Sequence, residues 1–111
     1  MNKRTKALAI SKDVKRAVYE RDKGMCVLCG APGDPVCHVV RRSQSGRGIE
    51  QNIVTLCQSC HRAYDEGSNI KKFGKGTTRE SIYCHLVAYL KGFYPDWNRN
   101  DMIYRKDDSS C

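Results

Sequence analysis

Apolar positions follow helical spacing in two parts of the chain, one near each end. In residues 12–22 they recur three to four positions apart; Ser11 precedes them as a helix-capping residue type, and Gly24 follows as a stop. In the second part, an apolar stripe begins at Ile82 after the capping sequence TTRE, and Pro95 ends it. We therefore expect one helix over residues 12–22 and a longer C-terminal helix.

Between these helices the apolar pattern changes to that of strands. Residues 36–40 (VCHVV) and 52–56 (NIVTL) are rich in β-branched residues, and the polar sequence RRSQSGRGIEQ joins them as a hairpin loop. The preceding sequence CVLCGAPGDP contains two Gly and two Pro, which is typical of a turn-rich knuckle. A further helix is expected from about Gln58 to Gly67. The predicted fold class is α+β, with a β-β-α unit flanked by an N-terminal and a C-terminal helix.

A length of 111 residues predicts one domain. We expect this domain to span residues 11–105, preceded by a flexible basic arm over residues 1–10 and followed by a mobile tail over residues 106–111. Two Phe, one Trp and a mean hydropathy of −0.64 indicate a small core. Additional cross-links are therefore expected to stabilise the fold.

Seven cysteines are the candidates for these cross-links. Cys26 with Cys29, and Cys57 with Cys60, form two C-x-x-C pairs, and four thiolates suit the tetrahedral coordination of Zn²⁺. A pair of redox-active dithiols is the alternative, but neither pair lies in a βαβ context. We predict one structural zinc ion. Of the three other cysteines, Cys84 and Cys111 have no partner at a useful spacing and are interpreted as a packed helix residue and a terminal thiol.

The charge balance suggests a class of partner. Twenty Lys and Arg against twelve Asp and Glu give a net charge of +8, which attracts phosphate polymers or forms a solvated basic face. The sequence contains no signal-peptide pattern and no apolar run of membrane-spanning length. We therefore expect a cytoplasmic protein without membrane contact, and nucleic acid is the leading candidate partner.

Several polar residues fall at facing positions of the predicted β-β-α unit. His38 lies in the first strand and Asn52 begins the second. His61 and Asp65 are four positions apart on one helix face, where an imidazole and a carboxylate can share one divalent cation. Each residue also has a simpler interpretation: a structural histidine, a turn asparagine, a replacement zinc ligand and a solvated carboxylate. His85 matches no motif and is interpreted as structural.

The sequences CHVVRRSQSG, EQNIVTLC and QSCHRAYD resemble the ββα-metal finger of the HNH endonuclease family. The resemblance covers the chain from Cys26 to Asp65, and the ending YPDWNRNDMIYRK is similar to small phage-type members. It implies metal-dependent hydrolysis of DNA phosphodiester bonds, which leaves 5'-phosphate and 3'-hydroxyl ends. The implied catalytic triad is His38, Asn52 and His61.

The resemblance also implies a role for each site residue. His38 would be the general base, Asn52 would tie the hairpin backbone together, and His61 and Asp65 would hold Mg²⁺, Mn²⁺ or Ni²⁺. Cys37 is a departure, because many members have Asp or His there as a further ligand. Either Cys37 is a small buried neighbour, or it is a doubtful ligand that would favour a softer ion.

Basic residues of the hairpin loop are predicted to bind DNA phosphates without reading bases: Arg41, Arg42 and Arg47, with Lys71, Lys72 and Lys75 extending the track. A monomer is expected to nick DNA, whereas cutting both strands would require a homodimer or successive encounters. The alternatives are a nonenzymatic zinc DNA-binding module, or an accessory subunit that works with phage DNA-packaging or other DNA-processing proteins. A phage-encoded chain would act in the host cytoplasm.

Overall fold

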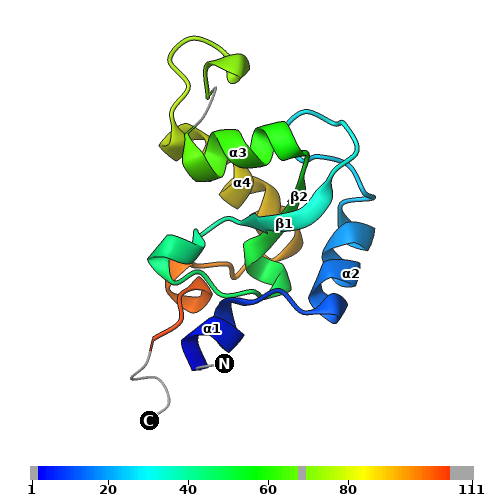
Figure 1. Ribbon diagram of the computed structural model, residues 1–111, viewed down its shortest axis with the longest axis vertical. Helices are drawn as coiled ribbons and strands as arrows, with labels where there is room; N and C mark the ends of the chain where they lie inside the picture. Colours follow the sequence, from blue (N-terminus) through cyan, green and yellow to red (C-terminus); the bar gives the residue numbers. More distant parts are fainter. Residues whose placement is uncertain (1–2, 68–69, 106–111) are drawn as a thin grey trace.

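The computed structural model describes residues 3–67 and 70–105 (Figure 1). Two strands form an antiparallel hairpin, and helices precede and follow it. This arrangement confirms the predicted α+β class, while the predicted tail at residues 106–111 lies outside the described residues. The helices and strands are α1 (Lys3–Leu8), α2 (Lys12–Arg21), β1 (Asp34–His38), β2 (Ile53–Leu56), α3 (Gln58–Glu66) and α4 (Arg79–Phe93). Short 3₁₀ turns span Arg42–Gln44, Glu50–Asn52, Ile70–Phe73 and Arg99–Met102.

The first strand of the hairpin, β1, begins and ends two residues earlier than the sequence predicts. Cys37 lies opposite Val54 at the regular end of the ladder, and the pairing is irregular between Asp34 and Cys37. Val39 and Val40 are buried but lie beyond the end of β1. Val39 N still binds the Asn52 carbonyl in the register of the ladder, whereas Val40 N binds the Asn52 side chain, and regular strand pairing ends there.

Helix caps fix the ends of α2 and α4. Ser11 caps α2 as predicted, because its hydroxyl accepts a hydrogen bond from Val14 N at 3.2 Å. The cap of α4 is Thr78, and its partner in the capping box is Ser81. The sequence TTRE therefore marked the right place, although the residues that make the box differ by one position. The buried face of α4 carries Ile82, Leu86 and Leu90.

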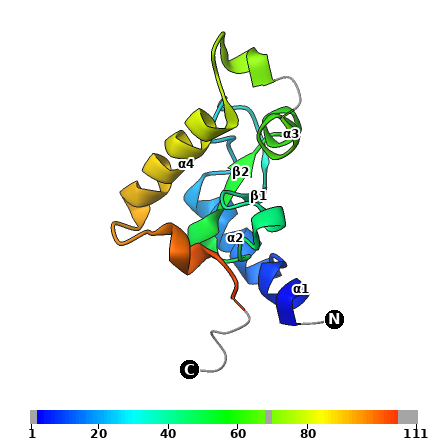
Figure 2. The same ribbon diagram turned by 90° about the vertical axis from the view of Figure 1, so that its left-hand side faces the viewer.

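The core forms where the hairpin, α3 and α4 meet (Figure 2). Val54 and Leu56 of β2 pack in one cluster with Tyr64 of α3 and Leu86 of α4. Trp97 joins the same cluster, and its indole N–H donates to the Gln51 carbonyl at 2.7 Å. The segment after α4 thus docks on the hairpin and completes the core.

A buried ion pair joins α2 to the hairpin, and the sequence pattern did not reveal it. Arg21 and Asp22 are 2.8 Å apart, and Asp22 also accepts hydrogen bonds from Thr55 N and the Tyr89 hydroxyl. Burial alone would raise the pKa of Asp22, but these donors hold it below its usual value. Arg21 donates in turn to the carbonyl of Ile53 at 2.7 Å. The pair therefore forms hydrogen bonds with two backbone groups of β2, Thr55 N and the Ile53 carbonyl.

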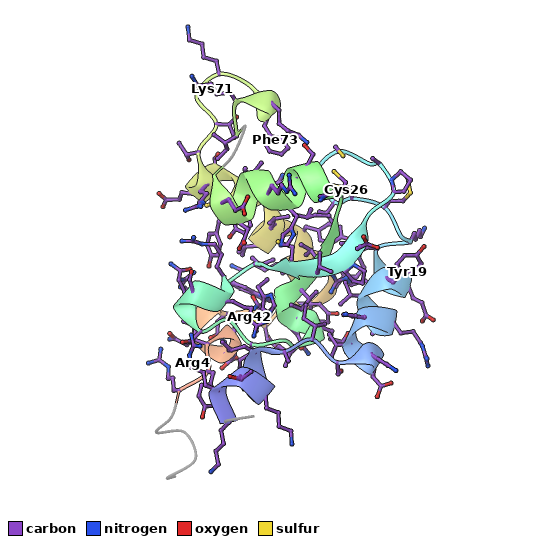
Figure 3. The ribbon with its side chains drawn as sticks, in the orientation of Figure 1. Arg4, Tyr19, Cys26, Arg42, Lys71 and Phe73 are labelled. Carbon is purple, nitrogen blue, oxygen red and sulfur yellow. The ribbon has the colours of Figure 1, made fainter. Side chains whose placement is uncertain are left out.

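The N-terminal segment forms α1, a helix that the sequence pattern did not predict. Leu8 is 1% exposed, and Gly48 N donates to the Ala7 carbonyl at 3.0 Å. The Arg4 side chain reaches the carbonyl of Arg42 in the hairpin loop (Figure 3). Residues 3–8 thus contact the hairpin loop directly, and the flexibility expected of residues 1–10 stays a prediction.

Candidate functional site

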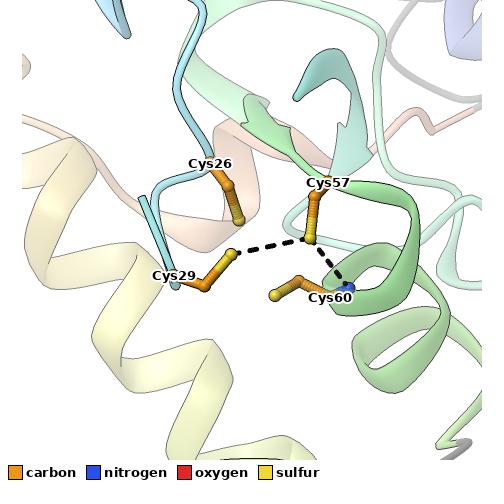
Figure 4. Close-up of side chains that lie close together, drawn as sticks. All are labelled: Cys26, Cys29, Cys57 and Cys60. Carbon is orange, nitrogen blue, oxygen red and sulfur yellow. Dashed lines mark hydrogen bonds between the residues drawn. The ribbon is translucent and has the colours of Figure 1, made fainter. Parts of the chain in front are cut away.

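Four cysteines converge where the knuckle meets the junction of β2 and α3 (Figure 4). All four Sγ atoms lie within 4.8 Å of one another, and Cys29 Sγ is 3.6 Å from Cys57 Sγ. A disulfide requires about 2.05 Å, whereas zinc bonds of about 2.3 Å place tetrahedral sulfurs just under 4 Å apart. The donor set therefore fits a structural metal such as zinc. Its members are Cys26, Cys29, Cys57 and Cys60.

The pKa shifts within this cluster have opposite directions: burial raises the pKa of Cys60 well above its ordinary value, whereas that of Cys57 is lowered. Burial alone would raise the pKa of Cys57, but hydrogen bonds from Cys60 N and the neighbouring thiols lower it to about 7. Lys72 Nζ lies 3.3 Å from Cys60 Sγ and 2.8 Å from Ser59 Oγ. Its positive charge offsets part of the negative charge that four thiolates carry around a divalent ion.

His38 ends β1 and is 8% exposed. Its Nε2 lies 2.7 Å from the carbonyl oxygen of Leu8, the last residue of α1. Burial lowers the pKa of His38 below its ordinary value, the contact with Leu8 raises it, and the charge of Arg42 lowers it further. The net shift is downward, so the neutral imidazole is favoured at pH 7.

The Leu8 contact determines which ring nitrogen of His38 carries the proton. A carbonyl oxygen can only accept a hydrogen bond, so the neutral ring places its hydrogen on Nε2 and a lone pair on Nδ1. Within residues 3–67 and 70–105, Thr55 Oγ1 is the sole fully buried side-chain N or O atom without a hydrogen-bond partner. His38 Nδ1 has no hydrogen-bond partner in this part of the chain either. Because it is not among the fully buried atoms without a partner, this nitrogen retains contact with solvent.

Asn52 lies at the base of the loop that follows His38 and is fully buried. Its Oδ1 accepts a hydrogen bond from Val40 N at 2.8 Å, and its Nδ2 donates to the carbonyls of Val40 and Arg47 at 3.1 and 2.8 Å. The amide thus joins both sides of the hairpin just beyond β1. This arrangement restricts the backbone that carries His38.

His61 and Asp65 lie one turn apart on α3, where His61 is half-buried and Asp65 is exposed. Both act electrostatically on His38: the carboxylate of Asp65 raises its pKa and His61 lowers it. The structure thus brings these groups within electrostatic range of one another. Among the described residues, the four cysteines are the only group of three or more whose metal-ligand atoms lie close together. The ligand atoms of His38, His61 and Asp65 do not form such a group in this structure.

Cys37 lies in the core, with 1% of its surface exposed. Burial raises its pKa well above the ordinary value, and the charge of Asp65 adds to this effect. A neutral thiol is a weak metal ligand. The position of Cys37 fits a small buried neighbour, which was the first of the two interpretations of this residue.

The three loop arginines occupy different surroundings. Arg42 is exposed in the turn after Arg41, while Arg47 is exposed and donates to the Asp101 carbonyl at 3.2 Å. Arg41 lines a pocket that also contains Arg79 and Arg99. Sequence reasoning missed these last two residues because they are distant in sequence and belong to no motif.

The comparison with known families agrees with this geometry. Residues 26–67 match the family model described as HNH endonuclease. The matched segment contains both cysteine pairs, the hairpin and α3, but it is less than half of the chain. No curated protein matches the chain. In the described part of the chain, no helix is both long and apolar enough to cross a lipid bilayer.

Proposed function

We propose that the HNH endonuclease domain at residues 26–67 makes this chain a metal-dependent nuclease that hydrolyses DNA phosphodiester bonds. The family match supports the class of activity and the class of substrate. The observation that carries the mechanism is the state of His38, whose Nε2 is bound by Leu8 O while Nδ1 stays open to solvent.

In this mechanism His38 acts as the general base through Nδ1. The neutral ring takes a proton from the attacking water, and its lowered pKa keeps it neutral at physiological pH. The proton that remains on Nε2 is held by the Leu8 carbonyl, which stabilises the imidazolium that forms. Asn52 does not touch the substrate and positions the backbone that follows His38.

His61 and Asp65 are the residues that would hold the catalytic divalent ion. Imidazole and carboxylate donors suit Mg²⁺, Mn²⁺ or Ni²⁺, with water and phosphate oxygens as the remaining ligands. Such an ion, when bound, supplies charge stabilisation at the scissile phosphate. The four-cysteine cluster is separate from this site and stabilises the fold that supports it.

A plasmid-nicking assay tests the proposal. His38→Ala should fold, keep about one zinc per chain and lose about 10²- to 10⁴-fold in cleavage rate, the usual contribution of a general base. The assay is run with Mg²⁺, Mn²⁺ and Ni²⁺ in turn, and with EDTA as the control. Full cleavage by the His38→Ala protein would reject the role of this residue.

Two observations favour a second function, a zinc DNA-binding module or an accessory subunit without its own activity. His38 has little exposed surface because α1 lies against it, and Cys37 does not supply a further ligand. The same assay separates the two functions. DNA binding without cleavage under every ion tested supports the module, and cleavage restored by a partner protein supports the accessory subunit.

A further inference from the structure

A cavity of about 320 Å³ opens beside the last turn of α3. Three arginines from distant parts of the chain line it: Arg41 after β1, Arg79 at the start of α4, and Arg99 in the turn after α4. The rings of Tyr64 and Tyr83 form part of its wall. We refer to this cavity as the arginine pocket.

Neutral groups hold two of these side chains in place. Arg79 Nε donates to the carbonyl of Tyr64, and Arg79 Nη2 donates to the carbonyl of Asp65, each at 2.8 Å. Arg99 Nη2 lies 3.2 Å from Gln44 Oε1, and its guanidinium lies over the Tyr83 ring at 5.3 Å from the centroid. Both guanidinium groups are therefore oriented before any ligand arrives.

The positive charge of the arginine pocket is not neutralised by the protein. Within the described residues, the ion pair of Arg21 with Asp22 is the one pair of opposite charges within 4.0 Å. Glu80 lines the pocket, but its carboxylate is farther than 4.0 Å from all three guanidinium groups. Three positive charges thus face one negative charge across a small cavity. Oriented guanidinium groups of this kind match phosphate oxygens in geometry and charge.

The arginine pocket lies close to the proposed catalytic residues. Arg79 binds the backbone of Asp65, and Arg41 follows His38 by three residues. We propose that the pocket binds a backbone phosphate of the DNA strand, next to the phosphate that is cut. The inference rests on DNA being the substrate, as proposed above. It assigns to Arg79 and Arg99 a phosphate-binding role and places Arg41 with them.

Salt-dependent binding to a short DNA duplex tests this inference. The catalytic ion is withheld, so binding is measured without cleavage. Arg41→Ala and Arg99→Ala should each weaken binding by roughly fivefold to tenfold at 0.1 M salt, and each should reduce the slope of log K against log salt by about 0.9. The matched control is Arg16→Ala, an exposed change of the same charge on α2 that does not line the pocket. It should leave the slope near the wild-type value.

A variant that should strengthen DNA binding controls for general damage to the fold. Glu80→Gln removes the one carboxylate that lines the pocket, so it should strengthen DNA binding.

Wild-type affinity and slope in both arginine variants would overturn the inference, as would a protein that does not bind DNA at all. Inorganic phosphate is tested separately by NMR; binding of free phosphate without any effect of the variants on DNA binding also overturns it. A protein that binds DNA through the pocket but does not cut it would reject the nuclease proposal and leave the phosphate-binding role of the pocket standing.

Discussion

At the scale of single residues, His38 and Asn52 divide the work of the proposed site. In the proposed mechanism His38 carries the reactive nitrogen, whereas Asn52 uses its amide to close the hairpin beyond the end of the strand ladder. The resemblance of the surrounding sequence to the HNH endonuclease family indicated both residues. The partner of each side chain did not follow from spacing, because Leu8 and Val40 contact them through backbone atoms, which any residue possesses.

The pKa of His38 gives a prediction at this scale. Burial and the positive charge of Arg42 lower it, so Arg42→Gln should raise it towards 6.5. Since the base acts in its neutral form, the acid limb of the cleavage rate should move to higher pH by the same amount. An NMR titration of His38 without added divalent ion measures the shift directly. Arg16→Gln is the control, and an unchanged or lower pKa in Arg42→Gln would contradict this account.

At the scale of elements, α1 lies against the hairpin loop through backbone contacts. Gly48 permits this close approach, because a Cβ at this position would lie 2.0 Å from the carbonyl oxygen of Ala9. The Leu8 carbonyl reaches His38 only while this contact persists. The orientation of the proposed base thus depends on a segment outside the matched β-β-α unit.

Gly48→Ala tests this dependence. The added methyl group should displace α1, release His38 Nε2 from Leu8, and let the pKa of His38 rise towards 6.5 as burial decreases. Nitrogen-15 shifts of the imidazole should change from the Nε2–H form to a mixture of tautomers. Cleavage should fall about tenfold, as for other supporting hydrogen bonds. Gly92→Ala is the control, since a Cβ there meets nothing within 4 Å. Wild-type shifts in Gly48→Ala would refute the link.

At the scale of the whole molecule, the four-cysteine cluster and the buried ion pair join elements that are separate along the chain. The four cysteines connect the knuckle to the β2–α3 junction, and Arg21 with Asp22 connects α2 to β2. Both links end at the strand whose partner carries His38. Loss of either is therefore expected to loosen the proposed site as well as the fold.

Removal of the metal is the prediction at this scale. Cys60→Ser should lose zinc and unfold at ordinary temperature, because structural zinc contributes about 10 kcal/mol or more in small metal-stabilised folds. Cys84→Ser is the matched control, since Cys84 is an exposed cysteine outside the cluster. Metal analysis and circular dichroism melting measure both effects. A cooperative melt at the wild-type temperature in metal-free Cys60→Ser would show that the cluster is not structural.

The sequence by itself determined the elements and ligands whose signals are local. Two C-x-x-C pairs, β-branched runs and helix caps each act over a few neighbouring residues, so the metal cluster, the hairpin and three of the helices could be predicted. Tertiary structure alone decided the Leu8 contact with His38, the Arg21–Asp22 pair and the arginine pocket. These features bring together residues far apart in the chain: Leu8 with His38, the adjacent Arg21 and Asp22 with β2, and Arg41 with Arg79 and Arg99. Such pairings leave no periodic pattern, because their energy arises from burial and distance that only the folded chain creates.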